Sequence, residues 1–535
     1  MSGFSSISIR AKTHHAGYAF HKYWARKPHN VVAAVLWEAG LSTGDIFVDP
    51  FCGSGVPASE AAVLGAETYC FDVNPTACLL TEITLTPPDP SELETAIVSL
   101  IEKLRKKHGI QHIHQGKNIR YWIHSLVVVC PGCKKPVSFA NAKKIGRTYS
   151  CLGCGIKLRF NLKSLVATHI TGAVAEDGSK FELDLIVKES KAGTSSCDQA
   201  FAENPRILAF AGMKTSDLFT RRNFRILEGF AEGIEKLPER LRPSARVVLT
   251  AASTQSSRLI AYRGGLVSGG PAWTVPGFWV PPIHMEMNPF FVLKTKLRKV
   301  AAGLRKLREL PGRGGCGKVH LSLGDTCVLI RKALKSTPKP KVIFLDPPYG
   351  DSIPYLEFSS VWNSFVGRLP SSANDISVSD RRQDANSWTE YARGFGAIIK
   401  ELSSHIDATT RVVLTFNNHN MRAWASVMGP IQAEGLRCVG AFYQEPAVVS
   451  TKSQLAKEGS YQGDFYVLFA KDEVKPLIGA ALLLKSFSRD YEKALAQPVV
   501  MLREKLLAAL RQNLKAEDFT ELEGSSTERS NEEEA

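Results

Sequence analysis

Two separate stretches of the chain alternate short apolar strand patterns with helix patterns, and this alternation constrains the fold more than any other feature. In residues 45–82 the run DIFVD is followed by the glycine-rich turn PFCGSGV, an alanine-rich helix pattern and the strand ETYCFDV. Residues 319–471 resume the alternation with VHLSLGD, VIFLDPPYG, RVVLTF and later strands. Strands that alternate with helices form largely parallel sheets covered by helices on both faces. We therefore predict an α/β fold in which both stretches contribute to one doubly wound sheet.

The chain has 535 residues, more than one compact domain usually holds, and the segment between the two stretches has a different character. It is rich in glycine, proline and basic residues and contains the paired cysteines, so it is interpreted as an insert. The predicted divisions are a first part of the α/β domain at 1–92, the insert at 93–315 with a metal-binding ribbon at about 125–160, a second part of the α/β domain at 316–472, a helical extension at 473–515 and an acidic disordered tail at 516–535.

The balance of charge favours a polyanionic partner. The chain carries 67 Lys and Arg against 52 Asp and Glu, a formal net charge of +15, and its last twenty residues are acidic, so the rest is more basic still. Such a surface suits nucleic acid, although a merely soluble basic protein has the same composition. No apolar run of membrane-spanning length and no signal-peptide pattern occur in the sequence, so we expect a cytoplasmic protein without a membrane partner.

The turn VDPFCGSG, residues 48–55, predicts a ligand site. Gly53 and Gly55 stand where a strand turns into a helix, and glycines there let the backbone approach a ligand beside the free N–H groups of the helix. Asp72 ends the next strand, 23 residues after Asp49, and an acid at about that distance commonly binds ribose hydroxyls. GxGxxG and GxxxxGK[ST] are absent from this turn, which disfavours a nicotinamide cofactor and an ATP-binding P-loop. A different nucleoside-containing cofactor is predicted. The alternative is that the glycines only allow tight packing of the turn and bind no ligand.

The motif FLDPPYG, residues 344–350, predicts recognition of an amino group on a flat base. Asp346 follows a strand, where open α/β sheets bind ligands, and Pro347 and Pro348 stiffen the turn and remove two backbone donors. The remaining groups suit such recognition, since Asp346 and the Pro347 carbonyl can accept the two amino hydrogens and Tyr349 can stack on the ring. An isolated match would more often be a proline turn capped by an aspartate.

The motifs DPFCGSG, FDVNP, LSLGD and LDPPYG occur in this order and together resemble those of the DNA amino-methyltransferases. The resemblance implies a class I, Rossmann-like methyltransferase that uses S-adenosyl-L-methionine. It places Asp49 near the methionine moiety, Asp72 at the ribose and Asp325 at the adenine ring of the cofactor. Upstream, HKYWARKP resembles the motif that completes the methionine end, where Lys27 or Arg26 pairs with the carboxylate. The cofactor-binding residues expected on this basis are Trp24, Arg26, Lys27, Asp49, Pro50, Phe51, Cys52, Gly53, Ser54, Gly55, Asp72 and Asp325.

The paired cysteines predict a structural zinc site. Cys130 and Cys133 form CPGC, Cys151 and Cys154 form CLGC, and 17 residues separate the pairs. This spacing is typical of a tetrahedral four-cysteine Zn²⁺ site, with redox pairs or buried thiols as alternatives. A cytosine C5 mechanism requires a covalent cysteine, usually after a proline; the one Cys next to a proline, Cys130, precedes it and belongs to the predicted zinc site. That class of methyltransferase is therefore disfavoured.

Basic segments of the insert predict contact with nucleic acid. Residues 217–227, 253–265 and a helix from about 288 to 310 combine Arg and Lys with polar and aromatic residues, which serve phosphate contact and base stacking. A solvated cationic face is the alternative. The expected contact residues are Arg221, Arg222, Arg258, Arg263, Lys294, Lys296 and Arg298.

Over residues from about 20 to 470, HKYWARKP, DPFCGSG, the CxxC pairs, DLFTRRN, NPFF and LDPPYG together resemble the bacterial and archaeal adenine-specific DNA methylases that contain a zinc ribbon. LFTRRNF departs from the LFTPRQ form of that group, so the resemblance does not extend to Arg222. It implies a site-specific DNA methyltransferase that methylates adenine N6 after flipping the base out of the duplex.

Several alternatives stay open at this point. Cytosine N4 is the alternative target in DNA, and RNA is the alternative substrate. Outside this class, a noncatalytic zinc-dependent nucleic-acid-binding protein has the same motifs. The resemblance also leaves open whether the enzyme works alone or is paired functionally with a restriction or defence nuclease.

Overall fold

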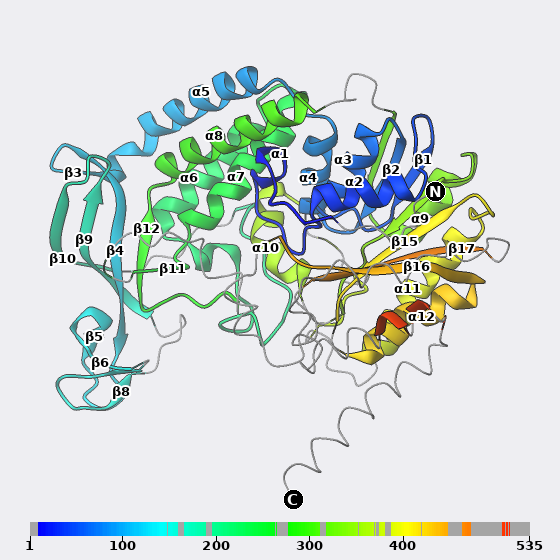
Figure 1. The fold of residues 1–535 in the computed structure, drawn as a ribbon. Helices are drawn as coiled ribbons and strands as arrows, with labels where there is room; N and C mark the ends of the chain where they lie inside the picture. Colours follow the sequence, from blue (N-terminus) through cyan, green and yellow to red (C-terminus); the bar gives the residue numbers. More distant parts are fainter. Residues whose placement is uncertain are drawn as a thin grey trace, which may run out of the picture.

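The computed structural model describes a central sheet and a large insert (Figure 1). Arg263, most of the expected C-terminal extension and the whole acidic tail lie outside the described residues. The described residues are 9–146, 148–158, 165–188, 195–262, 264, 277–310, 317–350, 353–368, 370, 374–379, 387–418, 420–447, 463–471, 506–508, 510, 511 and 513.

The central sheet has seven strands in the order β13-β2-β1-β14-β15-β17-β16. The first five in this order are parallel, and β17 is antiparallel to both of its neighbours. The prediction that both alternating stretches share one sheet is confirmed, since β1 of the first stretch pairs with β14 of the second. The strands are β1 (Ile46–Asp49), β2 (Glu67–Asp72), β13 (Val319–Leu323), β14 (Val342–Leu345), β15 (Arg411–Phe416), β16 (Leu436–Gln444) and β17 (Asp464–Lys471).

The inner strands are apolar along nearly their whole length because helices cover both faces of the sheet. Phe47 and Phe344 pack with α2 (His29–Glu38) and α3 (Val56–Val63) in one buried cluster. Val48 and Ile343 point the other way and pack in a second cluster with α9 (Thr326–Leu334), α11 (Ser387–Ser403) and α12 (Met421–Ala433). Figure 1 shows α11 and α12 below β16 and β17.

The insert consists of a helical layer and an antiparallel sheet, on the left of Figure 1. Its sheet has the order β10-β9-β4-β12-β11, and β3 and β5 also pair with β4. The helices are α5 (Pro90–His108), α6 (Arg221–Ile234), α7 (Arg242–Ser256) and α8 (Pro289–Arg308). The strands are β3 (Ile113–His114), β4 (Lys117–Val129), β5 (Pro136–Ser138), β9 (Leu165–Ala175), β10 (Lys180–Lys188), β11 (Ile260–Ala261) and β12 (Ile283–Met287), with short 3-10 helices at Gly109–His112, Phe139–Asn141, Thr215–Leu218 and Glu239–Leu241.

The cysteine-containing part of the insert is a small separate sheet in the order β6-β7-β8. Its strands are β6 (Lys143–Ile145), β7 (Thr148–Ser150) and β8 (Lys157–Leu158), and the cysteine pairs lie just before β5 and between β7 and β8.

The insert shares a hydrophobic core with helices of the α/β domain. One buried cluster joins the apolar faces of α5 to α8 with α4 (Pro75–Leu85) and α10 (Tyr355–Val366). Leu80 and Ile83 of α4 and Val361 and Trp362 of α10 are fully or almost fully buried in it. The short helix α1 (Ala16–Ala19) packs on α8. Among the described helices, none is both long and apolar enough to span a bilayer.

Candidate functional site

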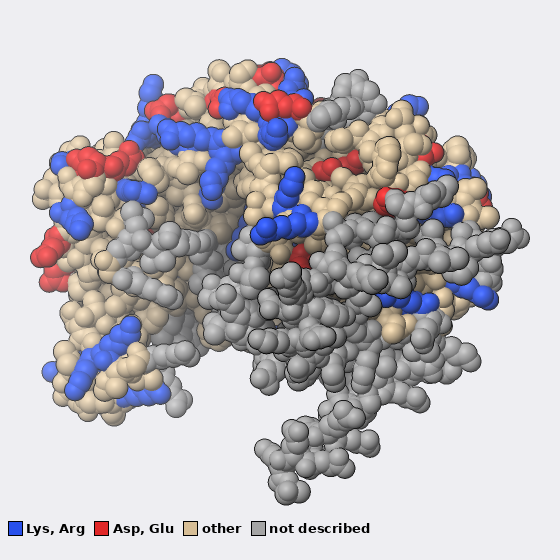
Figure 2. Space-filling view, in the orientation of Figure 1, with Lys and Arg blue, Asp and Glu red and all other residues tan. Residues whose placement is uncertain are grey.

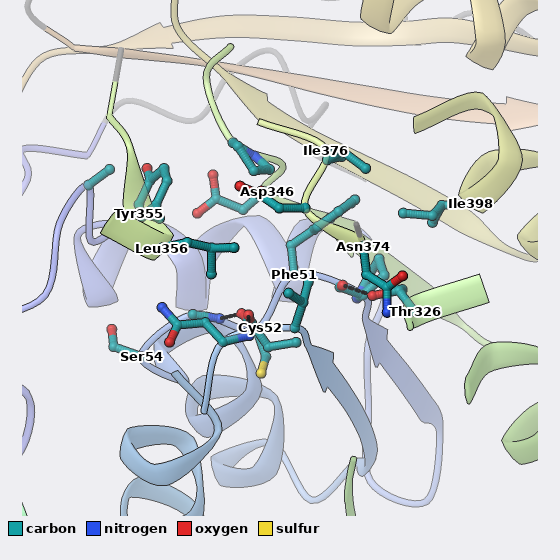
Figure 3. A pocket seen from close by; sticks show the side chains of 18 of the residues that line it. Phe51, Cys52, Ser54, Thr326, Asp346, Tyr355, Leu356, Asn374, Ile376 and Ile398 are labelled. Carbon is teal, nitrogen blue, oxygen red and sulfur yellow. Dashed lines mark hydrogen bonds between the residues drawn. The ribbon is translucent and has the colours of Figure 1, made fainter. Parts of the chain in front are cut away.

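A cavity of about 270 Å³ lies at the carboxyl ends of β1, β2, β13 and β14 (Figure 3). The strand order reverses between β1 and β14, and open α/β sheets bind ligands at such a reversal. In Figure 3, Phe51 from the glycine-rich turn and Asp346 from the second stretch lie around the same cavity. The expected site residues that line it are Trp24, Arg26, Lys27, Pro50, Phe51, Cys52, Gly53, Ser54, Asp72, Asp325, Asp346 and Pro348.

The glycine-rich turn is held by backbone geometry that a side chain would disturb. Gly53 has φ 51° and Gly55 has φ 79°, both in the left-handed region. Gly55 directly precedes α3, and a Cβ there would lie 2.9 Å from Cα of Thr81. Gly55 does not itself line the cavity, so its contribution is to the shape of the turn.

Asp72 ties this turn to the end of β2. Its Oδ2 accepts the Gly53 N–H at 2.9 Å and its Oδ1 accepts the Asn74 N–H at 2.8 Å. Burial raises the pKa of Asp72 to about 6, although the backbone N–H groups oppose this shift. Each carboxylate oxygen has a second lone pair, so hydroxyl donors of a ligand in the cavity can also be accepted.

Asp49 is fully buried at the end of β1 and does not line the cavity. Its Oδ1 accepts the Phe51 N–H at 3.1 Å, and its Oδ2 is buried with no partner in the described chain. Burial raises the pKa of this carboxyl group well above its usual range.

Lys27 forms the centre of a buried charge network. Its side chain is 1% exposed, and its Nζ lies 3.1 Å from Oδ1 of Asp346 and 3.5 Å from Oδ2 of Asp464. It also donates to the Tyr349 hydroxyl, which in turn donates to Asp464 at 2.9 Å. Burial alone would lower the pKa of Lys27, but the two carboxylates raise it above its usual value.

Asp346 has one engaged oxygen and one open oxygen. Its Oδ1 accepts from Lys27 and, at 2.8 Å, from the Thr415 hydroxyl, while no donor in the described chain reaches Oδ2. Burial raises the pKa of Asp346, and the Lys27 ammonium opposes that shift. The open Oδ2 is therefore the atom available to a ligand donor.

The remaining residues of LDPPYG differ in their environment. Tyr349 is 6% exposed, its ring lies under the Lys27 ammonium at 4.5 Å from the ring centre, and it does not line the cavity. Pro348 lines the cavity, and its carbonyl accepts from the Tyr391 hydroxyl at 2.7 Å. Pro347 is not part of the lining.

Trp24 and Arg26 lie at another wall of the cavity. The Trp24 ring stacks on Trp362 with 4.8 Å between ring centres, and its indole N–H is buried without an acceptor in the described chain. Arg26 donates to the carbonyls of Tyr18 and His21 and to Ser54 Oγ. An acceptor on a ligand would satisfy the Trp24 N–H, whereas Arg26 already holds the loop together.

Several lining residues carry no sequence signal that would have identified them. Asp464 begins β17 and enters the network beside the cavity without any motif around it. The lining residues without a motif come from the start of α9, from the segment 374–376 and from α11, whose Phe395 stacks on Phe51. They include Thr326, Asn374, Asp375, Ile376, Gly394, Ala397 and Ile398. Tyr23 and Asn74 also line the cavity; they lie within HKYWARKP and FDVNP but were not predicted as site residues.

The four cysteines form a cluster that can hold a metal ion. All four Sγ atoms lie within 4.8 Å of one another, with 3.5 Å between Cys130 and Cys154 and 3.8 Å between Cys133 and Cys151. Tetrahedral coordination with Zn–S bonds of about 2.3 Å places sulfurs about 3.8 Å apart, so the set fits Zn²⁺. The two turns are alike, since the residue after each second cysteine has positive φ, 59° at Lys134 and 74° at Gly155.

The basic residues expected to contact nucleic acid have different surroundings. Arg222 forms an ion pair with the buried Glu286 and lies over the Trp122 ring, and it lines a cavity of about 350 Å³ together with Arg221. Arg258 is 5% exposed, and Lys294 pairs with Glu102 at 3.0 Å. Lys296 lines a third cavity, and Arg298 is exposed on α8.

Comparisons with known proteins show similarity to methyltransferases over part of the chain. Residues 28–106 match a family model described as an RMKL-like methyltransferase domain. The type II methyltransferase M.MjaII of Methanocaldococcus jannaschii is 26% identical over 103 residues, 19% of this chain and 19% of that protein. The type II methyltransferase M.MvaI of Kocuria varians is 29% identical over 89 residues, 15% of this chain and 20% of that protein. The chain thus spans about a fifth of the length of each relative, and the matches support a mixed α/β fold with a methyltransferase domain.

Proposed function

We propose that the chain transfers a methyl group from S-adenosyl-L-methionine to the exocyclic amino group of a DNA base, adenine N6 in particular. One observation supports this most strongly: residues of the glycine-rich turn and Asp346, nearly 300 positions apart in the sequence, line one cavity. A methyl donor and an acceptor amino group must meet within such a space for direct transfer.

The residues present fit the cofactor. When bound, it supplies an electrophilic methyl group on a sulfonium. Asp72 would accept the ribose hydroxyls with the lone pairs that Gly53 and Asn74 leave open, and Asp325, which lines the same cavity, would contact the adenine ring. The unpartnered indole N–H of Trp24 provides a donor for the carboxylate at the methionine end. Arg26 supports that end by fixing the loop next to Ser54.

The chemistry depends on the open oxygen of Asp346. An exocyclic amino nitrogen is a poor nucleophile because its lone pair is delocalised into the ring. Oδ2 of Asp346 accepts one amino hydrogen, and the second is accepted by a carbonyl of the same motif, which favours a localised lone pair on nitrogen. Lys27 and Thr415 hold Oδ1, so they orient Oδ2 toward the cavity. As the new N–C bond forms, the bond from the methyl carbon to sulfur breaks, and the methylated nitrogen then gives one proton to Oδ2 of Asp346, which restores the neutral amine.

The substrate is proposed from the comparisons and from charge. Two type II methyltransferases each match a fifth or less of the chain, and the chain is basic overall. The Asp at the start of DPPY favours adenine over cytosine through the family resemblance. The base must leave a duplex to enter such a cavity, so base flipping is part of the proposal.

The cysteine cluster is proposed to hold a structural Zn²⁺ ion. Four thiolates complete a tetrahedron and leave no open position for catalysis. The basic residues of the insert, among them Arg221 and Arg298, are proposed to contact the DNA.

The direct test is to incubate the purified protein with labelled S-adenosylmethionine and unmethylated DNA or RNA, digest to nucleosides and identify the labelled species. Label in N6-methyldeoxyadenosine is expected, and an Asp346→Ala variant should abolish it. Label in N4-methyldeoxycytidine, or only in RNA nucleosides, would contradict the adenine assignment. A noncatalytic role would be favoured if the protein bound DNA in a zinc-dependent way but neither it nor Asp346→Ala methylated any substrate.

A further inference from the structure

A second cavity, of about 480 Å³, adjoins the proposed active site. Tyr23 and Arg26 line both cavities, so the segment 21–27 forms a wall that the two cavities share. The other walls come from α7, α8 and Trp362 of α10, whose ring stacks on Trp24 of the first cavity. A ligand in the second cavity would therefore lie next to the residues that build the first.

This cavity is lined by lysines and by no described carboxylate. Lys22 comes from the N-terminal segment, and Lys296 and Lys299 come from α8, where a spacing of three residues puts them on one face. No Asp or Glu is part of the described lining, and neither Lys296 nor Lys299 has an ion pair within the described chain. In Figure 2, basic side chains lie over the part of the molecule where Figure 1 draws α1 and α8.

The environment of Lys296 is electrostatically unfavourable for its charged form. Its side chain is partly buried, and burial together with Lys299 lowers the pKa of Lys296 to about 8. A cation that is partly removed from water beside another cation is unfavourable unless an anion offsets it. The other two lysines of α8, Lys294 and Lys306, pair with carboxylates. Within the described chain, the α8 lysines without a carboxylate partner are therefore the two that line the cavity.

The remaining polar groups suit an oxyanion with several oxygens. Gln255 of α7 adds a side-chain amide that can donate, and Lys ammonium groups bind phosphate as point charges without demanding one geometry. Such a site needs no base-specific contacts, which agrees with a role in positioning a strand.

We propose that this cavity binds a backbone phosphate of the DNA strand that carries the target base. The inference rests on the proposed function, because it assumes that DNA is the substrate. A phosphate bound in this cavity would contact the segment 21–27. That segment includes Lys27, whose ammonium group pairs with Asp346. Binding of the strand would then be coupled to the orientation of the catalytic carboxylate through one short segment.

The test compares the double variant Lys296→Met, Lys299→Met with the single variant Lys306→Met on the same helix. Affinity for a DNA duplex is measured by fluorescence anisotropy at several salt concentrations, and methyl transfer is measured at varied DNA and varied S-adenosylmethionine. Each phosphate contact contributes about 0.9 to the slope of log K against log salt, which is roughly tenfold in affinity at 0.1 M salt. Loss of this one phosphate contact in the double variant should therefore weaken DNA affinity roughly tenfold at 0.1 M salt and raise KM for DNA, while KM for S-adenosylmethionine and the melting temperature stay unchanged.

Two outcomes would overturn the inference while the proposed function stands. One is a double variant that methylates and binds DNA as Lys306→Met does, with the same salt slope. The other is a loss of S-adenosylmethionine affinity with no change in DNA affinity, which would assign the lysines to the cofactor. Wild-type protein that binds RNA through these lysines but does not bind or methylate DNA would instead overturn the proposed function and the inference together.

Discussion

At the scale of single residues, the main finding is that Lys27 lies buried between two carboxylates. It contacts Asp346, the residue proposed to accept the target amino group, and Asp464 on a different strand. Removal of one partner from a buried ion pair typically costs about 3–5 kcal/mol, because the remaining charge is left without compensation. Lys27 is therefore a positioning residue for the proposed reaction.

We expect Lys27→Met to slow methyl transfer at pH 7 at least about a hundredfold, which corresponds to about 3 kcal/mol. Without the ammonium, the pKa of Asp346 rises further, and a protonated carboxyl group no longer accepts at Oδ2. The rate should consequently recover toward high pH, as measured in single-turnover reactions. The double variant Lys27→Met, Asp464→Asn should restore part of the activity, since it removes one uncompensated charge. A purely structural role would instead lower stability without any change in the pH profile.

The raised pKa of Asp72 predicts how cofactor binding depends on pH. The folded pKa is about 6, above the ordinary 3.8, so protonated Asp72 favours the folded state at low pH, and this contribution is lost as pH rises through 6. Ribose hydroxyls donate to the ionised carboxylate, so the affinity for S-adenosylmethionine should fall about tenfold from pH 7 to pH 5.

Calorimetric titration across this pH range checks the expectation. Asp72→Asn should bind weakly at every pH, whereas Asp346→Asn should keep the dependence, since Asp346 is proposed to contact the base. A pH-independent affinity in the wild-type protein would show that Asp72 does not contact the ribose.

At the scale of elements, two glycines with left-handed backbone flank β1: Gly44 precedes the strand, and Gly55 ends the glycine-rich turn that joins β1 to α3. Gly44 and Gly55 have similar φ values of 84° and 79°, but their surroundings differ: a Cβ at Gly44 meets nothing within 4 Å, whereas one at Gly55 meets the Thr81 backbone. This pair separates the cost of left-handed backbone from the cost of a steric clash.

Gly44→Ala should destabilise the protein by about 1–2 kcal/mol, the cost of a left-handed non-glycine residue. Gly55→Ala carries the same cost plus displacement of α4, so its melting temperature should fall further and its affinity for S-adenosylmethionine should drop as well. Thermal unfolding and calorimetry on both variants provide the comparison. Equal effects of the two substitutions would mean that the contact with Thr81 relaxes freely.

The cysteine cluster predicts that the small sheet β6-β7-β8 depends on a bound metal ion. One Zn²⁺ per chain is expected by elemental analysis, and Cys133→Ser should lose it and destabilise the small sheet β6-β7-β8. Cys197→Ser removes a thiol outside the cluster and should retain the metal. Full metal content in Cys133→Ser would contradict the site.

At the scale of the whole molecule, the insert and the α/β domain are not independent modules. Helices α4 and α10 of the α/β domain contribute side chains to the core formed by α5 to α8. The proposed active site depends on this shared core, because Trp24 of the cavity packs on Trp362 of α10. An insert that folds against the α/β domain can hold the residues proposed to contact DNA at a constant position relative to the cavity.

Ile83→Ala, in the shared core, should therefore destabilise both parts together by about 2–5 kcal/mol. Thermal unfolding followed by circular dichroism and by tryptophan fluorescence should show one coincident transition at a lower temperature than in the wild-type protein. Two separate transitions, with only one of them shifted, would show that the parts unfold independently.

Features that depend on local periodicity and spacing could be predicted from the amino-acid sequence. Alternating apolar patterns predicted that the two stretches form one sheet, the glycines predicted the turn, and the cysteine spacing predicted a cluster that the structure brings together. Asp72 and Asp346 were recognisable because strands of a parallel sheet end at a common edge. The contacts of Lys27 with Asp346 and Asp464, and the cavity that Lys22, Lys296 and Lys299 share, follow from tertiary packing alone. Those contacts join segments far apart in the chain through helix packing, which leaves no periodic trace in the sequence.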